Sequence, residues 1–263
     1  MPPYKFLTER ALFIPKEKAL VIADLHLGIE YGLRKSGITI PSQTENLAAR
    51  LEKLIKQTRA KKLIILGDIK DEFRGLSWQE MREAPEFFSE LAKKVEMHLV
   101  KGNHDGLIEN ILPKSERIKI YEPAGFRLGK FAFTHGQAWI SKEMLKAKIL
   151  LMGHMHPAVE FFSGVSRRSE AEPMRYGARL VEHVWLRMPA NKSGLGKKYK
   201  SKVNLETGII LPAFNLLAGG ASFNRKDFEP MGPLMKKGML WKAAEIFLLD
   251  GTYLGGLGRL KPK

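Results

Sequence analysis

The stretch Ala19-Leu20-Val21-Ile22-Ala23-Asp24-Leu25-His26 joins a short apolar run to two polar side chains that can bind a metal ion. The apolar run has the length of a β-strand and is too short for a helix. The same arrangement occurs at four other places in the chain: residues 63–66 before Gly67-Asp68, 97–100 before Lys101-Gly102-Asn103-His104-Asp105, 131–133 before Thr134-His135-Gly136, and 149–152 before Gly153-His154-Met155-His156. This pattern predicts several strands that end in chemically reactive turns.

Helical patterns lie between these runs. Apolar residues at helical spacing over 47–55 follow Ser42 and Glu45, which are spaced as a capping box, and a second helix is expected from Ser77 with Glu80 three residues later. Alternation of strands and helices over 19–156 predicts an α/β fold.

The second half of the chain has a different pattern. Residues 181–188, 208–214 and 243–249 predict further strands, with no long amphipathic helix between them. We therefore expect one domain over residues 1–263. It would have a motif core at about 20–157 and a β-rich half at about 158–263.

Composition limits the class of protein. The chain has 263 residues and no cysteine, which excludes a disulfide scaffold and thiolate metal sites. Any metal would be bound by His, Asp, Glu or Asn. No apolar run approaches the ~20 residues of a membrane span. Residues 1–10 lack the apolar core of a signal peptide, so we expect a cytoplasmic protein.

The charge balance is unusual, because 44 Lys and Arg face 28 Asp and Glu, for a net charge of +16. Such an excess indicates an anionic partner such as nucleic acid, a phosphate ester or lipid headgroups, or else only a soluble basic surface. Residues 163–204, read as a basic loop region, hold ten Lys and Arg against three acids, and residues 191–202 are expected to be an exposed, mobile loop. Nucleic acid is therefore one candidate partner, while the oligomeric state stays open.

Five of the seven histidines lie in the turns after the predicted strands, together with two aspartates and one asparagine. In extended backbone, residues i and i+2 point to one side, so Asp24 and His26 would converge on one ion, as would His154 and His156. The string Gly102-Asn103-His104-Asp105 offers an amide oxygen, a proton donor near neutral pH, and a carboxylate that can orient that donor.

Imidazole and carboxylate ligands together suit Mn, Fe, Zn or Ni better than Mg or Ca. A carboxylate such as Asp68 can bridge two ions. Two ions roughly 3.5–4 Å apart form a clamp for phosphoryl transfer.

In order and approximate spacing, this set of motifs resembles the calcineurin-like metallophosphoesterase superfamily. Within it, residues 23–28, 66–70 and 212–215 look like the ICC-like predicted phosphoesterases of archaea and bacteria, a group that includes the DNA-ligase-associated enzymes. The resemblance implies a four-layer αββα sandwich with two mixed β-sheets.

The resemblance also implies a site with two divalent ions, most simply Mn²⁺. Asp24, His26 and His156 would hold the first ion, Asn103, His135 and His154 the second, and Asp68 would bridge them. His104 would protonate the leaving oxygen or stabilise the phosphate, with Asp105 behind it, and a hydroxide between the ions would attack phosphorus in line.

The chain departs from the phosphoprotein phosphatases of this superfamily. They continue the Gly-Asp motif with Asp-Arg-Gly and place Arg before Gly-Asn-His, whereas here residues 69–73 read Ile-Lys-Asp-Glu-Phe and Lys101 precedes the motif. We therefore expect a phosphodiesterase, with nuclease action on DNA or RNA as the alternative. Lys70, Arg34 and Arg74 flank the motifs and are candidate substrate contacts.

Two other classes fit less well. A catalytically silent scaffold of the same fold should have lost ligands, and none is missing. A lipid-linked pyrophosphatase acting at a membrane surface should have an exposed amphipathic helix, and residues 141–150 are too short and mixed for one.

Overall fold

The computed structural model describes residues 2–164 and 177–260. The strands of the first half are β1 (Lys5–Leu7), β2 (Ala11–Ile14), β3 (Ala19–Ala23), β4 (Lys62–Leu66), β5 (Glu96–Val100), β6 (Ile118–Tyr121), β7 (Phe126–Leu128), β8 (Phe131–Phe133) and β9 (Ile149–Met152). Those of the second half are β10 (Pro157–Gly164), β11 (Gly177–His183), β12 (Trp185–Pro189), β13 (Thr207–Ile210), β14 (Ala221–Ser222), β15 (Glu245–Phe247) and β16 (Tyr253–Gly256). The α-helices of the described residues are α1 (Ile29–Lys35), α2 (Thr44–Thr58), α3 (Trp78–Lys94) and α4 (Lys192–Tyr199).

The first sheet has the order β1-β2-β3-β4-β5-β6 among the described residues. Its first three strands pair antiparallel, and β3 to β6 pair parallel. Strand β3 is buried at every position because both faces of the sheet are covered, which is why its sequence is a continuous apolar run. Parallel pairing brings the carboxyl ends of β3, β4 and β5 to one edge.

A second sheet, also mixed, has the order β16-β15-β12-β13-β9-β8-β7 within the described residues. Strands β8, β9 and β13 are parallel to one another, and the other pairs are antiparallel. The carboxyl ends of β8 and β9 therefore also lie at one edge of this sheet.

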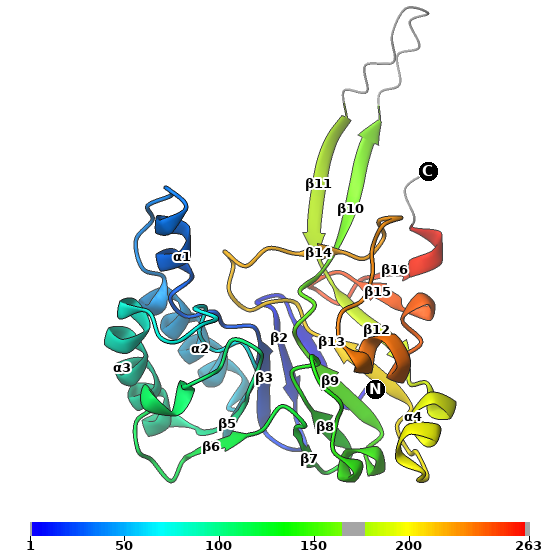
Figure 1. Cartoon of the computed structure of the whole chain (residues 1–263), viewed down its shortest axis with the longest axis horizontal. Helices are drawn as coiled ribbons and strands as arrows, with labels where there is room; N and C mark the ends of the chain where they lie inside the picture. The colour runs from blue at the N-terminus through cyan, green and yellow to red at the C-terminus, as the bar shows by residue number, and fades with distance from the viewer. Residues whose placement is uncertain (1, 165–176, 261–263) are drawn as a thin grey trace, which may run out of the picture.

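Three apolar clusters separate four layers of structure. One cluster packs α2 and α3 on the outer face of the first sheet, and alternate residues of β3 such as Val21 and Ala23 belong to a second cluster between the two sheets. The third cluster covers the outer face of the second sheet with α4 and the short turns 142–146 and 234–238. The expected four-layer αββα sandwich with two mixed sheets is confirmed (Figure 1).

A further small sheet, β11-β10-β14, lies outside the two layers. Strands β10 and β11 form a long antiparallel hairpin that projects from the body, on the opposite side of this view from α1 (Figure 1). Its presence was not predicted. Among the described residues, no helix combines the length and apolar character needed to cross a bilayer.

The basic segment 163–204 differs from the prediction. Residues 192–199 form α4, because the Asn191 side chain caps its first turn (Gly194 N–H to Asn191 Oδ1, 3.0 Å) and Leu195 is buried. The predicted mobile loop over 191–202 is therefore wrong. In the described part of the segment, residues 177–183 and 185–189 are also strands rather than loop. Arg167, Arg168 and Arg175 lie outside the described residues.

Two other local predictions need correction. The expected strand 181–188 is two strands, since residues up to His183 pair with β10 and residues from Trp185 join the second sheet. Helix α2 begins at Thr44 with Gln43 at its N-cap position and no side-chain cap, so Ser42 lies one residue too early for a capping box with Glu45. The Ser42 hydroxyl accepts from the Thr44 N–H (3.3 Å) and donates to Glu83 (2.7 Å). The capping box of Ser77 and Glu80 is confirmed.

Candidate metal centre

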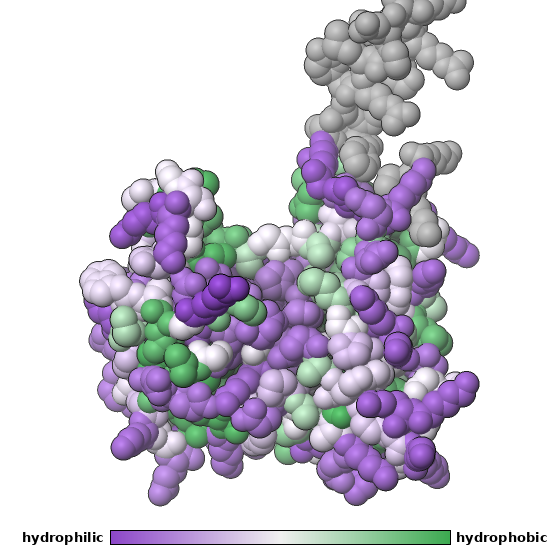
Figure 2. Space-filling model, viewed as in Figure 1, coloured by the Kyte–Doolittle hydropathy of each residue, from purple (hydrophilic) through white to green (hydrophobic). Residues whose placement is uncertain are grey.

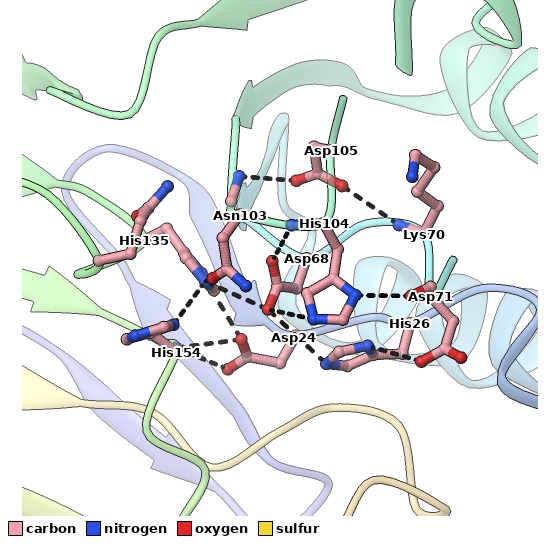
Figure 3. A network of polar contacts seen from close by, with 12 residues as sticks. Asp24, His26, Asp68, Lys70, Asp71, Asn103, His104, Asp105, His135 and His154 are labelled. Carbon is pink, nitrogen blue, oxygen red and sulfur yellow. Dashed lines mark hydrogen bonds and ion pairs between the residues drawn. The ribbon is translucent and has the colours of Figure 1, made fainter. Parts of the chain in front are cut away.

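Turns at the carboxyl ends of five strands converge on one edge of the sandwich (Figure 3). They carry eight polar side chains: Asp24 and His26 after β3, Asp68 after β4, Asn103 and His104 after β5, His135 after β8, and His154 and His156 after β9. Backbone N–H of His154 donates to Asp24 Oδ1 (3.0 Å), which ties the turns of the two sheets together. Every side chain predicted as a metal ligand is in this group.

Among the residues that the structure describes, three groups of side chains could hold metal ions, and one of them consists of His26, Asp71 and His104. The other two overlap at Asp68: one consists of Asp24, His26, Asp68 and His156, the other of Asp68, His135 and His154. The ligand atoms within each group lie within 4.8 Å of one another. Asn103 Oδ1 joins the last of these groups at 3.2 Å from His135 Nε2. Asp68 is shared by two groups, which is the placement expected of a bridging carboxylate.

The backbone at the site is in the left-handed region at five positions: Asp24, His26, Asp68, His154 and His156, with φ from 39° to 69°. Non-glycine residues rarely adopt it, and each costs roughly 1–3 kcal/mol where the surrounding structure enforces it. The side chains converge as expected. The extended backbone predicted for residues 24–26 and 154–156 is wrong, because these turns contain left-handed residues.

In three of the predicted ligand histidines, the Nδ1 atom, which faces away from the site, lies within hydrogen-bond distance of an oxygen atom. Nδ1 of His26 lies 3.0 Å from Asp71 Oδ1, Nδ1 of His135 lies 2.8 Å from Leu66 O, and Nδ1 of His156 lies 3.0 Å from Gly219 O. Carboxylate and carbonyl oxygens only accept, so each Nδ1 carries a proton and donates it. The lone pair of each Nε2 is thereby directed into the site, as in known metal–histidine–oxygen arrangements.

Two of these lone pairs face one another, because His26 Nε2 lies 3.3 Å from His156 Nε2. The lone pair of His135 Nε2 faces His154 Nδ1 at 3.1 Å, where a proton on His154 can be donated to it. The two acceptor nitrogens of His26 and His156 repel unless a cation or an added proton lies between them. The donor set and its spacing therefore fit a divalent metal bound by imidazole and carboxylate.

The charges of the buried groups are strongly coupled. Burial alone would raise the pKa of Asp68, but the adjacent His135 and His26 hold it well below its usual range. Burial opposes charging of His135, yet the Asp68 carboxylate outweighs it and raises the pKa of His135 to about 9. Burial and the nearby His135 lower the pKa of His154 to about 4. The carboxylates thus attract positive charge, which a metal ion would supply.

His104 is oriented differently from the ligand-type histidines. Its Nδ1 lies 2.5 Å from the carbonyl oxygen of Asp71 and donates to it, while Nε2 faces Asp68 Oδ2 at 3.9 Å. Nε2 is thus directed toward the shared carboxylate without touching it.

Asp105 was expected to orient His104, and that expectation is wrong. The Asp105 carboxylate is buried and accepts from the backbone N–H groups of Gly102 and Ile69 (both 2.7 Å) and of Lys70 (3.2 Å). Burial raises its pKa to about 6. Asp105 therefore fixes the turn after β5 against the turn after β4, and the Asp71 carbonyl takes the place beside His104.

At two motif positions only glycine fits, because a neighbouring residue of the site lies too close for a Cβ atom. A Cβ at Gly67 would lie 2.4 Å from the His135 ring, and Gly67 also has φ +75°. A Cβ at Gly102 would lie 2.2 Å from Asp68 Oδ1. The Gly-Asp and Gly-Asn-His motifs need glycine because the two turns pack directly on the site.

Sequence reasoning missed the residues that support the site from behind. The Asp71 carboxylate contacts His26, and its backbone carbonyl accepts from His104. Asn215 is buried, and its side-chain amide donates to the carbonyl oxygens of Leu25 and His26 (3.0 and 3.1 Å). Only the short distance of Asp71 from Asp68 along the chain pointed to it.

Lys70 was expected as a substrate contact, and it is instead fully buried, with its ammonium group donating to the Glu72 carbonyl. Lys101, where phosphoprotein phosphatases have an arginine, is paired with Glu109 and with Glu122, the latter at 3.0 Å. Neither lysine is directed to the centre. Arg34 and Arg74 lie on the surface beside their motifs.

Comparison with known proteins agrees with this geometry. The model of the calcineurin-like phosphoesterase family matches residues 18–188, more than half of the chain. The chain therefore belongs to the calcineurin-like phosphoesterase family, whose members are metal-dependent hydrolases of phosphoesters.

Two solved structures are similar to this chain. The nuclease MPE from Pseudomonas putida superposes with a TM-score of 0.55 at 22% identity, over 93% of this chain and 90% of that one. The phosphoesterase Yfce from E. coli covers 90% of this chain and 96% of its own at 18% identity, with a TM-score of 0.40. No curated protein matches the chain. The likeness to the nuclease establishes a shared fold.

Proposed function

We propose that this protein is a dinuclear, metal-dependent phosphodiesterase. The observation that carries the proposal is Asp68, whose carboxylate belongs to two ligand groups at once. Asp24, His26 and His156 would hold one ion with Asp68, and Asn103, His135 and His154 would hold the other. Mn²⁺ suits this mixture of imidazole and oxygen ligands, and Fe, Zn or Ni would also fit.

When bound, the two ions would polarise the phosphoryl oxygens and supply a hydroxide nucleophile near neutral pH. His104 would act as the general acid, because its Nδ1 proton is held by the Asp71 carbonyl and its Nε2 faces the shared carboxylate. A proton on Nε2 would pass to the leaving oxygen as the ester bond breaks. Asp105 would act by positioning the two turns and not by touching substrate.

A diester is favoured over a monoester for an electrostatic reason. Phosphoprotein phosphatases of the family grip a doubly charged phosphate with arginines, and here residues 69–73 contain no arginine and the other position holds Lys101, which is paired with Glu122. A singly charged diester requires less additional positive charge beside the ions.

Nuclease action on DNA or RNA is the second candidate. It is supported by the net charge of +16 and by the shared fold with a nuclease. Binding to a nucleic acid through this charge would weaken steeply with salt, since each neutralised phosphate releases counterions.

The test is a panel of bis-p-nitrophenyl phosphate, p-nitrophenyl phosphate, cyclic nucleotides and single-stranded DNA, each with added Mn²⁺. We expect turnover of diesters, and activity on the monoester alone would contradict the proposal. Asp68→Ala should lose both metal and turnover, whereas His104→Ala should keep metal and lose about 10²–10⁴-fold in kcat. Equal loss of metal in His104→Ala would mean that His104 is a ligand.

A further inference from the structure

An exposed aromatic ring stands at the rim of the candidate centre. Phe73 is 57% exposed, and its ring lies against that of His104, with centroids 5.4 Å apart and planes at 80°. His104 in turn contacts the His26 ring at 5.2 Å. The three rings form a row from the surface into the site.

The segment that carries Phe73 is anchored from inside. The buried Glu80 carboxylate accepts from the backbone N–H groups of Asp71 (2.9 Å) and Glu72 (2.8 Å) on one side and of Ser77 (2.6 Å) on the other. Buried Lys70 adds a contact to the Glu72 carbonyl. These hydrogen bonds hold the backbone on both sides of Phe73, and the Phe73 side chain points toward solvent from this turn.

Placing a phenyl ring in water beside a polar centre is unfavourable unless another group covers it. A group that covers the exposed part of the ring removes apolar surface from water, which favours binding. The surface around the middle of this face is mostly hydrophilic, between the end carrying α1 and the base of the β10–β11 hairpin (Figure 2). The exposed Phe73 ring beside His104 fits a ligand that is polar at its phosphate and flat and apolar at one end.

We propose that Phe73 is a stacking platform for a nucleobase on the leaving-group side of the scissile phosphate. His104 would protonate the leaving oxygen, so whatever that oxygen carries lies next to the ring that touches His104. A purine or pyrimidine has the flat face that such a ring recognises, without a requirement for a particular base. This inference rests on the proposed phosphodiesterase function and adds the class of substrate.

The experiment compares thymidylyl-thymidine with two analogues, each lacking one of the two bases, and includes bis-p-nitrophenyl phosphate. We expect Phe73→Ala to raise KM for the dinucleotide about tenfold with kcat within about threefold. The effect should vanish on the analogue that lacks the leaving-side base, and Phe73→Trp should restore binding. Tyr253→Ala removes an aromatic ring of similar exposure (55%) on β16 and should change neither parameter.

A second measurement does not depend on turnover. In EDTA, fluorescence anisotropy should show that Phe73→Ala binds a labelled oligothymidylate severalfold more weakly than the wild type does. An equal loss on all three dinucleotide substrates would overturn the proposal, because the ring would then only support His104. Hydrolysis of bis-p-nitrophenyl phosphate without any dinucleotide hydrolysis would overturn it too, while leaving the phosphodiesterase function intact. A wild type inactive on every diester would refute that function itself.

Discussion

Replacing Asp71 by alanine should separate metal binding from proton transfer. The Asp71 carboxylate holds Nδ1 of His26 at 3.0 Å, whereas its backbone carbonyl holds Nδ1 of His104. The substitution removes the carboxylate and keeps the carbonyl. Loss of such an outer partner of a metal-bound histidine typically lowers metal affinity by about 10–100-fold, which corresponds to about 1.4–2.8 kcal/mol.

The assay is a Mn²⁺ titration followed by calorimetry and by the activation curve for bis-p-nitrophenyl phosphate. We expect the apparent Kd for Mn²⁺ to rise by this factor in Asp71→Ala, and by less in Asp71→Asn, whose amide oxygen can still accept. At saturating Mn²⁺, kcat should stay within a few-fold of wild type because His104 keeps its partner. Glu72→Gln is the matched control, since the Glu72 carboxylate pairs with Lys35 (2.8 Å) outside the site. An unchanged Kd, or a large loss of kcat at saturation, would refute this division of roles.

Three further predictions follow from packing, charge and ligand binding. Gly102→Ala places a Cβ 2.2 Å from Asp68 Oδ1 and should abolish Mn²⁺ binding, whereas Gly106→Ala, with nothing within 4 Å, should be neutral in the same titration. Burial and, to a smaller extent, the positive charge of Arg10 lower the pKa of His183 to about 4 in the folded protein. As the pH falls, the unfolded chain therefore takes up a proton at His183 before the folded protein does. Denaturant unfolding in EDTA should therefore show that wild type loses more stability between pH 7.5 and 4.5 than His183→Gln, by roughly 1 kcal/mol for a half-buried group; an equal loss would contradict this. Mn²⁺ at a hundredfold excess over Kd should add about 2.7 kcal/mol for each ion bound and raise Tm by roughly 5–10 °C per ion relative to EDTA, and an equal rise in Asp68→Ala would show that the metal binds elsewhere.

The α/β class was predictable from the residues because the buried strands are continuous apolar runs, whereas the four-layer sandwich was implied only by the family resemblance. Residues 19–23 and 63–66 are buried on both faces, so composition alone identifies them as central strands. The ends of such strands must meet at one edge when they are parallel. The gathering of Asp24, Asp68 and Asn103 was therefore expected before any coordinates.

The supporting contacts were not predictable in the same way. The Asp71 carbonyl beside His104 is a backbone atom, and any residue could have supplied it. Asn215 reaches the turn at His26 from 189 residues away, through a loop whose course depends on both sheets. Helix α4 depends on one cap and one buried leucine within a segment dominated by lysine and glycine, so its polar composition indicated a loop.

Five of the seven predicted ligand positions have left-handed backbone although none of them is glycine. A left-handed residue just after a strand turns the backbone sharply, so that its side chain lies over the end of that strand. Strands of both sheets can therefore direct ligand side chains to one point. At roughly 1–3 kcal/mol each, the strain of five such residues is comparable to the stability of a typical domain. Contacts such as His154 N–H to Asp24 offset part of it, and metal–ligand bonds between Asp24, Asp68 and the facing imidazoles would offset more. A bound cation would therefore stabilise the strained turns at this sheet edge. Metal affinity and the stability of these turns should change together in every variant that alters them.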